Sequence, residues 1–562
     1  MSEAPTIELC DVTCRDGDQS RGVNLSTQDK LLVLRKDDCF GLAYAEGGFP
    51  RSNPTDQAVF EQLKNDPLHS TALVAFGMTR RKGIPAEQDL GMQALLASGA
   101  PAIAVVGKSS RFQVETALKT TPKENLAMIR DSVAYLLANG AKEVLYDAEH
   151  FFDAFGADPD YALDTLRAAH EAGARRLILC DTIGHATPDR VGRTVSAVHA
   201  AFQEAILGFH PHEDRGLAVA NVLAAVREGV RHVQGTWNGI GERCGNVDLF
   251  KVIPNLTLEG YHVLPEEQMK HLTTFSEDAA RRMKIRRHPG QAFVGENAYA
   301  HKGGMHVSAM ERDLATYESR ESPPERWGNE RIIVGSKQSG LANVRHLVAK
   351  PSCAITPTLK QQILGERSLQ EKILRAQKKR EARGYTFDRG EASLTLLMLR
   401  AIGAFTPKIR IIESEIHSTL SVHAAGEIPE DVEQVREEAD GIKNTRAIVL
   451  VGVNGDAETE YHEVAKDDGP IGALSEAVLK ALEHRFPQLR QLKLVDYIVE
   501  KAPNDEGTHS KVQVTVEWED GEDRFYTVGV SGNSIEAGWQ CVIDGYEYKL
   551  LKDDVLASAR AA

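Results

Sequence analysis

The chain has 562 residues, of which 42% are hydrophobic and 26% are charged, so it is long enough for several domains and has an ordinary globular composition. Its formal net charge of −15 argues against nonspecific binding to nucleic acid, because there is no surplus of basic residues to neutralise phosphates. No apolar run approaches the length that is needed to span a membrane, so no membrane-embedded segment is expected.

The cysteines and the first residues bear on the compartment. The 7 cysteines are scattered and include no Cys-x-x-Cys pair, which argues against a disulfide framework and for a reducing compartment. The chain starts with Met-Ser-Glu-Ala-Pro, which is not a basic segment followed by an apolar stretch, so no signal peptide is expected. We therefore expect a cytoplasmic protein.

The first half of the chain repeats one pattern, a short apolar run followed by a longer helical stretch, at intervals of about 25 to 40 residues. The runs are Ile7–Thr13, Leu42–Gly48, Thr71–Gly77, Ala102–Lys108, Glu143–Glu149, Arg176–Thr182, Ile206–His212 and His232–Asn238. Successive βα units in this number predict an α/β fold of the (β/α)8 type, the TIM barrel. An open doubly wound sheet is the alternative, but no Gly-x-Gly-x-x-Gly fingerprint follows the first run.

The remainder of the chain changes character twice. After about residue 254 the strand rhythm stops, and helical patterns such as Met269–Met283 and Thr358–Arg383 predict a helical connecting region. Alternating apolar residues return in Lys408–Ser421, Ala447–Val453 and Lys511–Trp518, which predicts a separate C-terminal α+β domain with a frayed tail after Asp554. We expect a barrel domain over 1–274, a helical connecting region over 275–404 and an α+β domain over 405–555.

Polar and charged residues stand at or just after the end of nearly every predicted strand. They are Arg15, Asp16, Glu46, Arg80, Arg81, Lys108, Glu149, Asp181, Thr182, His210, His212 and Asn238. The C-terminal ends of the strands meet at one rim of a barrel, where the active site of this fold lies. Charges are expensive to remove from water, so a ring of them at one rim predicts a ligand or metal site.

The segment His210-Pro211-His212 is the sharpest local signal. Residues two apart in a strand face the same way, so both imidazoles can bind one ion from a single strand end. Asp16 would complete a set of two histidines and one carboxylate with open positions, which suits Mg²⁺, Mn²⁺, Zn²⁺ or Fe²⁺. The alternative for the tripeptide is a turn that is hydrogen-bonded to the backbone.

A metal at this rim would polarise a carbonyl group as a Lewis acid, and Arg15 could stabilise negative charge that develops on the same oxygen. Glu149 could transfer or orient a proton, although the segment around it could equally be a solvated loop. The glycine-rich segment Gly239–Asn246 follows the last strand, where glycine permits close approach of the backbone to a ligand.

These segments together resemble the DRE-TIM metallolyase superfamily and, within it, the 2-isopropylmalate, homocitrate and citramalate synthases. The carrying segments are Arg15-Asp16-Gly17-x-Gln19, His210-x-His212, Gly239–Asn246 and Ala300–His306. Four further segments are most similar to the citramalate synthases, namely Glu46–Pro54, Ala75–Arg81, Tyr146–Asp153 and Val233–Thr236. Near the end, Thr527–Ser531 with Ile535–Ala537 resembles the regulatory domain of that family.

The resemblance implies a metal-dependent Claisen condensation of acetyl-CoA with a 2-oxo acid, most closely pyruvate, which gives citramalate and CoA in isoleucine biosynthesis. It implies that Asn246 lies close to a metal held by Asp16, His210 and His212, the metal being Mg²⁺, Mn²⁺ or Zn²⁺. It also implies a homodimer, in which His301 comes from the partner subunit, and an amino-acid effector at the C-terminal domain.

The resemblance further assigns residues to the reaction and to the two substrates. The implied catalytic residues are Arg15, Glu149 and His301. The implied contacts of the oxo acid are Arg15, Thr182, Gly48, Phe76, Arg80 and Tyr146. The implied contacts of acetyl-CoA are Gln19, Gly241, Glu242, Arg243 and Gly245.

The sequence also departs from the family pattern. Cys14 occupies a position where the family usually has leucine, and Glu213 one where it has asparagine. Phe49 and Arg51 replace a tryptophan and a glycine in the segment where the family selects its oxo acid. The same chemistry on a larger or more anionic oxo acid, as in isopropylmalate-, homocitrate- or phosphonomethylmalate-type synthases, is therefore an alternative. Arg51, Arg80 and Lys108 could admit such an acid. A lyase or aldolase of the superfamily and a non-catalytic relative are further alternatives.

Overall fold

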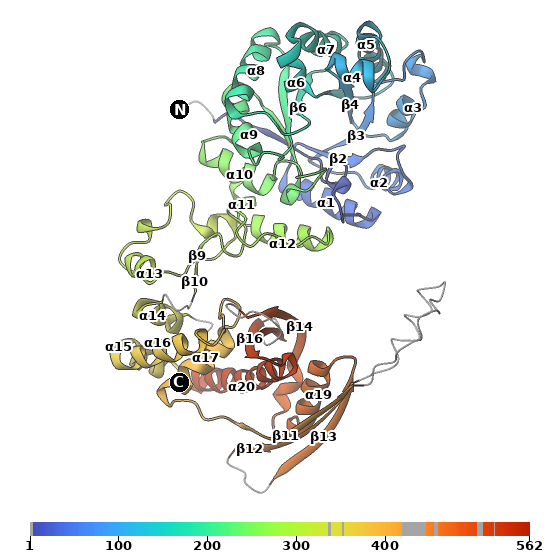
Figure 1. Ribbon diagram of the computed structural model, residues 1–562. Helices are drawn as coiled ribbons and strands as arrows, with labels where there is room; N and C mark the ends of the chain where they lie inside the picture. Colours follow the sequence, from blue (N-terminus) through green and yellow to red (C-terminus); the bar gives the residue numbers. More distant parts are fainter. Residues whose placement is uncertain are drawn as a thin grey trace. The chain divides into compact units, whose positions relative to one another are not determined.

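The computed structural model describes residues 4–334, 339–350, 353–418, 445–454, 459–502, 510–521 and 523–561 (Figure 1). The chain divides into two compact units. The first comprises Met1–Tyr299 and Ser319–Arg331, and the second comprises Ala300–Glu318 and Ile332–Ala562. No helix among the described residues is both long enough and apolar enough to cross a membrane.

Eight parallel strands of the first unit form a closed barrel in sequential order. They are β1 (Glu8–Asp11), β2 (Tyr44–Gly48), β3 (Ala72–Met78), β4 (Ala102–Lys108), β5 (Glu143–Glu149), β6 (Arg176–Asp181), β7 (Ile206–Pro211) and β8 (His232–Gly235). The last strand pairs with the first, with Glu8 opposite His232 and Asp11 opposite Gly235. The predicted (β/α)8 barrel is confirmed, and every predicted run contains one of these strands.

Helices alternate with the strands and surround them, as Figure 1 shows. They are α1 (Thr27–Phe40), α2 (Pro54–Asn65), α3 (Leu90–Ala97), α4 (Arg111–Thr116), α5 (Pro122–Ala138), α6 (Phe151–Ala157), α7 (Pro159–Glu171), α8 (Pro188–Ala201), α9 (Ala218–Arg227) and α10 (Leu249–Leu258). Several begin with proline after a capping residue, and α1 begins with a capping box between Ser26 and Asp29. Short helices α11 (Glu266–Met269) and α12 (Leu272–Arg282) follow.

A closed ion network lies at the N-terminal ends of the strands. Arg176, the first residue of β6, donates to both carboxylate oxygens of Glu8 at 2.8–3.0 Å and also to Glu143. Its guanidinium lies 4.8 Å from the ring centroid of Tyr44, whose hydroxyl donates to Glu143 at 2.8 Å. Each of these residues is therefore held by the others.

The second unit contains a helical part and an α+β part. Its first elements are β9 (Ala300–His301), α13 (Gly304–Met310), β10 (Ile332–Ile333), α14 (Leu341–Ala349), α15 (Pro357–Gly365), α16 (Arg367–Glu381) and α17 (Glu391–Ile402). Two antiparallel three-stranded sheets follow, each with a helix after its last strand. They are β11 (Ile409–Ser418), β12 (Thr445–Val453), β13 (Glu460–Asp467) and α19 (Pro470–Leu482), then β14 (Leu492–Lys501), β15 (Val512–Asp520), β16 (Asp523–Ser531) and α20 (Ser534–Ala561).

The predicted C-terminal α+β architecture is thus confirmed. The helix α20 extends past Asp554 to Ala561, so the predicted tail is part of a helix. The predicted strand Lys408–Ser421 corresponds to β11, and its last residues, 419–421, lie outside the described residues.

Candidate active site

A cavity of about 460 Å³ opens at the C-terminal ends of the barrel strands. Its lining residues come from most of the strand ends and from the loops that follow them. They are Arg15, Asp16, Gln19, Phe49, Phe76, Met78, Thr79, Val106, Gly107, Lys108, Leu118, Asp147, Glu149, Cys180, Thr182, His210, His212, Glu242 and Arg243. Many of the polar residues that the sequence predicts at this rim therefore line one cavity.

Arg15 is fixed in this cavity by two carboxylates and an aromatic ring. The backbone N–H groups of Arg15 and Asp16 both donate to the carbonyl of Val12, so the chain turns sharply after β1. The Arg15 Nε donates to Glu46 at 2.6 Å and its Nη1 donates to Asp16 at 2.8 Å. Its guanidinium carbon lies 3.9 Å from the centroid of the Phe76 ring, within the range of a cation–π contact.

Asp16, His210 and His212 each offer one ligand atom, and these three atoms lie within 4.8 Å of one another. The His210 Nδ1 lies 2.6 Å from the carbonyl oxygen of Gln234, so this nitrogen carries the proton. Its Nε2 is the nitrogen that faces the cluster, and it lies 3.5 Å from the Asp16 carboxylate. A hydrogen bond from the far nitrogen is how proteins orient a metal-binding histidine.

The electrostatics favour the ligand forms of Asp16 and His212. Burial opposes protonation of His210, but its contact with the Asp16 carboxylate raises the pKa of His210 above the ordinary value. Burial opposes ionisation of Asp16, but the Arg15 guanidinium and the His210 imidazole hold the pKa of Asp16 well below its ordinary value. Burial, together with the neighbouring His210, lowers the pKa of His212 to about 4. An ionised carboxylate and a neutral imidazole are the forms that bind metal ions.

Two buried atoms beside the cluster have no hydrogen-bond partner among the described residues, His212 Nδ1 and Asn246 Oδ1. The Asn246 side chain is aimed at the cluster, because its Nδ2 donates to Asp16 and to the Ile240 carbonyl, both at 3.2 Å. Buried polar atoms without partners require an explanation. A divalent cation that takes imidazole, carboxylate and carbonyl ligands fits this donor set.

The loop between β8 and α10 depends on its glycines. Gly241 has φ +149° and Gly245 has φ +95°, and a Cβ on either would collide with Asn246 or with the Gly239 carbonyl. Of the five residues expected to contact acetyl-CoA, Gln19, Glu242 and Arg243 line the cavity. The two glycines do not line it, and they instead allow the loop to bend around Asn246.

Lys108 and Glu149 form the opposite wall. They end the adjacent strands β4 and β5 as register partners, and the Lys108 ammonium is paired with the Glu149 carboxylate. Asp147 lies on the same inward face of β5, and burial, followed by repulsion from Glu46, raises its pKa to about 7. Its Oδ1 has no partner in the described part of the chain.

Three residues that the resemblance assigns to the oxo acid do not line the cavity. Tyr146 is fully buried on the outward face of β5, since side chains alternate along a strand and both Asp147 and Glu149 face the cavity. Gly48, at φ +129°, lies where a Cβ would come within 2.5 Å of Asp56, so it serves the turn after β2.

The third is Arg80, whose guanidinium is held by Glu124 and Asp131 at 2.8–2.9 Å and whose backbone N–H donates to Ser132. These contacts fasten the loop after β3 to α5 and turn Arg80 away from the cavity. Arg51 is exposed and lies along a different surface groove. Only Lys108 of the three basic residues considered for a larger oxo acid therefore reaches the cavity. Arg15, Thr182 and Phe76 of the expected contacts do line it.

His301 belongs to the second unit. Its Nε2 lies 3.3 Å from the Glu318 carboxylate, and its ring centroid lies 6.5 Å from that of His306. Glu213, which departs from the family pattern, does not line the cavity, and its backbone N–H donates to the Gly245 carbonyl at 2.9 Å.

Gln234 and Asp147 were not predicted as site residues from the sequence. Gln234 stands inside the Val233–Thr236 segment, and a requirement for a partner of His210 could have pointed to it. Strict strand alternation from Glu149 would have pointed to Asp147 and away from Tyr146.

Comparison with known proteins agrees with the architecture. An HMGL-like family model matches residues 6–278, a homocitrate synthase post-HMGL domain-like model matches residues 293–366, and a LeuA allosteric (dimerisation) domain model matches residues 411–550. A closed barrel with a carboxylate and two histidines at its strand ends, followed by these modules, defines an enzyme of the HMGL-like barrel class.

Relatives along the whole chain narrow this class. A protein of Synechocystis sp. named (R)-citramalate synthase is 40% identical over 550 residues, which cover 96% of this chain and 96% of that relative. Proteins of the same name from Aquifex aeolicus and Geobacter sulfurreducens are each 38% identical and cover 98–99% of this chain and 99% of their own length. The chain belongs to the (R)-citramalate synthase family, so the resemblance predicted from the sequence is confirmed.

Proposed function

We propose that the protein condenses acetyl-CoA with pyruvate, giving citramalate and CoA, in a metal-dependent Claisen-type reaction. The observation that carries this proposal is the cluster of Asp16, His210 and His212 beside Arg15 in one cavity of about 460 Å³. The name shared by relatives at 38–40% identity supports the same reaction.

Asp16, His210 and His212, with the Asn246 carbonyl oxygen close by, are the residues that would hold a divalent cation. When bound, such an ion polarises a carbonyl group as a Lewis acid. Gln234 contributes by fixing the His210 ring, so that Nε2 is the atom presented to the site. The ligand types suit Mg²⁺, Mn²⁺ or Zn²⁺.

Arg15 and Thr182 would bind the oxo acid. The Arg15 Nε and Nη1 already donate to Glu46 and Asp16, so a substrate oxygen is expected at Nη2, where it gains a charge-assisted hydrogen bond. The Thr182 hydroxyl accepts from the His150 N–H at 2.8 Å. Its own proton is therefore available to a substrate carboxylate.

The condensation needs one group to take a proton from the acetyl methyl carbon and another to give a proton to the new alcohol oxygen. We assign these transfers to Glu149 and His301. The carbon–carbon bond forms between that methyl carbon and the ketone carbon of pyruvate, and water then cleaves the thioester to release CoA. Lys108 holds the Glu149 carboxylate in place at the cavity wall.

The parts of the chain would divide this work. The barrel over 1–274 would carry the metal and Glu149, and the connecting region over 275–404 would supply His301 across a homodimer. Residues 405–555 would bind an amino-acid effector. The match of residues 411–550 to an allosteric (dimerisation) domain model supports both the dimer and the effector.

Thiol release from acetyl-CoA tests the proposal. With Mn²⁺ or Mg²⁺ present, the protein is offered pyruvate, 2-oxobutyrate, 2-oxoisovalerate, 2-oxoglutarate and a phosphono analogue. We expect the highest kcat/KM with pyruvate. A higher value with a more anionic acid would overturn the assignment of pyruvate and direct attention to Lys108. No release with any acid, while metal binds, would overturn the synthase and favour a lyase.

A further inference from the structure

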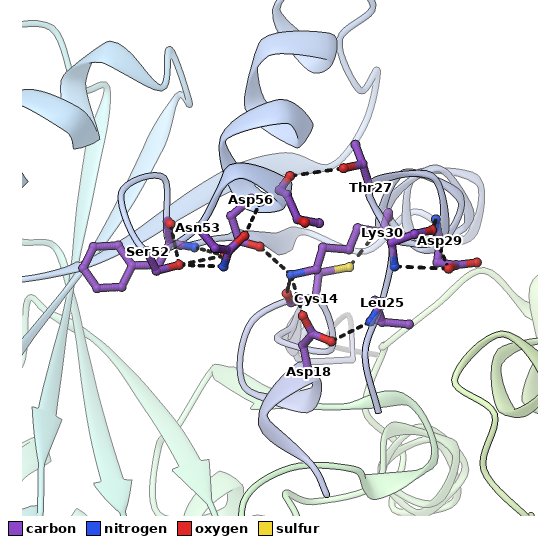
Figure 2. Close-up of polar contacts among 12 residues, drawn as sticks. Cys14, Asp18, Leu25, Thr27, Asp29, Lys30, Ser52, Asn53 and Asp56 are labelled. Carbon is purple, nitrogen blue, oxygen red and sulfur yellow. Dashed lines mark hydrogen bonds and ion pairs between the residues drawn. The ribbon is translucent and has the colours of Figure 1, made fainter. Parts of the chain in front are cut away.

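A lysine lies buried behind the catalytic loops, where a polar helix face would normally be exposed. Lys30, in the first turn of α1, has 1% of its surface exposed. Its ammonium contacts the Cys14 carbonyl at 2.7 Å, the Asp18 carboxylate at 2.8 Å and the Asp56 carboxylate at 2.5 Å (Figure 2). An ammonium has three N–H donors, so each finds one acceptor.

Stability alone does not account for this arrangement. Removing an ammonium and two carboxylates from water carries a desolvation penalty, and buried ion pairs often stabilise a fold no better than apolar residues of the same volume. What distinguishes Lys30 is where its acceptors lie. Cys14 and Asp18 belong to the segment that follows β1, and Asp56 lies in the first turn of α2, the helix that follows β2.

The first pair of acceptors controls the loop after β1. Cys14 supplies the carbonyl immediately before Arg15, and its thiol is directed to the Lys30 carbonyl at 3.6 Å. Asp18 stands between Asp16 and Gln19, and its second oxygen accepts from the Leu25 N–H at 2.8 Å. Lys30 thus holds this segment on both sides of Arg15 and Asp16, and immediately before Gln19.

The third acceptor controls the loop after β2. While one oxygen of Asp56 contacts Lys30, the other accepts from the Phe49 N–H at 2.8 Å and from the Ser52 hydroxyl at 3.3 Å. Phe49 lines the cavity and packs edge-on against Phe76 at 6.1 Å between ring centroids. Phe76 in turn lies beneath the Arg15 guanidinium.

We propose that Lys30 is a positioning residue that locks the loops after β1 and β2 together and thereby sets Arg15, Gln19 and Phe49 around the cavity. The proposal rests on the proposed function for its kinetic consequences. It assigns separate tasks to the two carboxylates, Asp18 for the side that carries Gln19 and Asp56 for the side that carries Phe49.

Two variants of the carboxylates separate these tasks. We expect Asp18→Asn to raise KM for acetyl-CoA about tenfold and Asp56→Asn to raise KM for pyruvate by about the same factor, since each loses one charge-assisted hydrogen bond. Each variant should change the other KM by less than about twofold. If each variant changed both KM values equally, or changed neither, the assignment of separate tasks to Asp18 and Asp56 would be overturned.

Lys30 itself is tested as Lys30→Met combined with Asp56→Asn, because Lys30→Met alone leaves two carboxylates without a counter-charge. The control is Arg176→Met, which removes another buried cation between carboxylates at the other end of the barrel. We expect faster hydrogen–deuterium exchange in residues 14–25 and 48–53 for the Lys30 variant only. Exchange that rises equally in both variants, or in neither, would overturn the positioning role.

Mn²⁺ affinity, measured by calorimetry, separates this proposal from the proposed function. We expect it to fall about tenfold in the Lys30 double variant, since Asp16 shifts with its loop, and to stay unchanged in Arg176→Met. If the parent protein releases no thiol with any oxo acid, the proposed function fails, while the exchange and affinity measurements still decide on Lys30.

Discussion

Each end of the barrel has a buried arginine between two carboxylates, but the two ends differ in how fully these carboxylates are hydrogen-bonded. At the N-terminal ends of the strands, Arg176 lies between Glu8 and Glu143, and all four oxygens of these carboxylates accept hydrogen bonds. At the C-terminal ends, Arg15 lies between Glu46 and Asp16. Buried atoms without a hydrogen-bond partner among the described residues occur at both ends. They are His232 Nδ1 and Nε2 at the N-terminal end, and Glu46 Oε1, Asp147 Oδ1, His212 Nδ1 and Asn246 Oδ1 at the C-terminal end.

The difference that bears on function lies in the carboxylates around each cation. Every carboxylate oxygen around Arg176 is paired, whereas Glu46 beside Arg15 keeps an oxygen without a partner. A buried cation among unpaired atoms is incomplete, because each such atom forfeits about 1–3 kcal/mol of hydrogen bonding until a ligand arrives. We therefore expect substitutions at the C-terminal ends of the strands to weaken metal binding or catalysis, and substitutions at the N-terminal ends to lower the free energy of unfolding.

The largest effect is expected from His210→Ala. It removes one of the three candidate metal ligands. Mn²⁺ affinity by calorimetry should therefore fall more than about 100-fold, since losing a residue that only supports a ligand already costs about 10- to 100-fold. Thiol release should disappear with it. The control is His232→Gln, which replaces a fully buried histidine at the other end and should leave Mn²⁺ binding unchanged. Unchanged affinity in His210→Ala would place the metal elsewhere.

Arg15→Met should lower kcat about 10² to 10³-fold, the effect of losing a donor to a developing oxyanion. Mn²⁺ should still bind, because the three ligands remain. Steady-state kinetics of thiol release check this. If only KM for the oxo acid rises while kcat is kept, Arg15 binds the substrate without stabilising charge that develops during the reaction.

Arg176→Met should reverse this pattern. It leaves Glu8 and Glu143 without their counter-charge, so the free energy of unfolding should fall by about 3 kcal/mol. Urea unfolding followed by circular dichroism measures the loss. The kcat and both KM values at 25 °C should match those of the parent protein, and a kinetic defect would contradict the separation of the two ends.

The smallest effect is expected from acid. Burial opposes ionisation of Glu8, but hydrogen bonds with His232 and Arg176 lower its pKa from the ordinary 4.5 to about 2. Because the folded-state pKa is the lower one, this stabilisation is complete above about pH 4.5 and is lost as the pH falls towards 2. Glu8→Gln should flatten the stability profile in that window by about 1–2 kcal/mol, a value reduced by partial exposure to solvent.

Much of the barrel could be predicted because its strands are buried on both faces and read as apolar runs, and the predicted ranges of β4 and β5 match the observed ones. The strand β13 was not predicted, because its residues are mostly polar and only Ala465 is buried. An exposed strand has few alternating apolar residues, so its sequence gives little signal for a strand.

Residues of the candidate site could be predicted where residue type and spacing alone indicate a role. They could not be predicted where the role depends on which side chains the fold buries together. His210 and His212 could be paired from spacing alone. Arg80 could not be excluded, since its ion pairs come from residues about fifty positions away on α5. Lys30 could not be found, because a lysine in the first turn of an amphipathic helix reads as a solvated residue.

The pairing of β1 with β8 has a consequence for how the protein acquires its activity. The barrel can close only after residues 232–235 have been synthesised, because they pair with residues 8–11. At about 5–20 residues per second, ribosomal synthesis separates the two strands by roughly 10 to 45 s. The residues of the candidate metal site are divided in the same way, because Asp16 is synthesised at the start of the barrel and His210 and His212 near its end. A nascent barrel therefore cannot assemble this cluster early, and the cluster forms only with the final closure of the sheet.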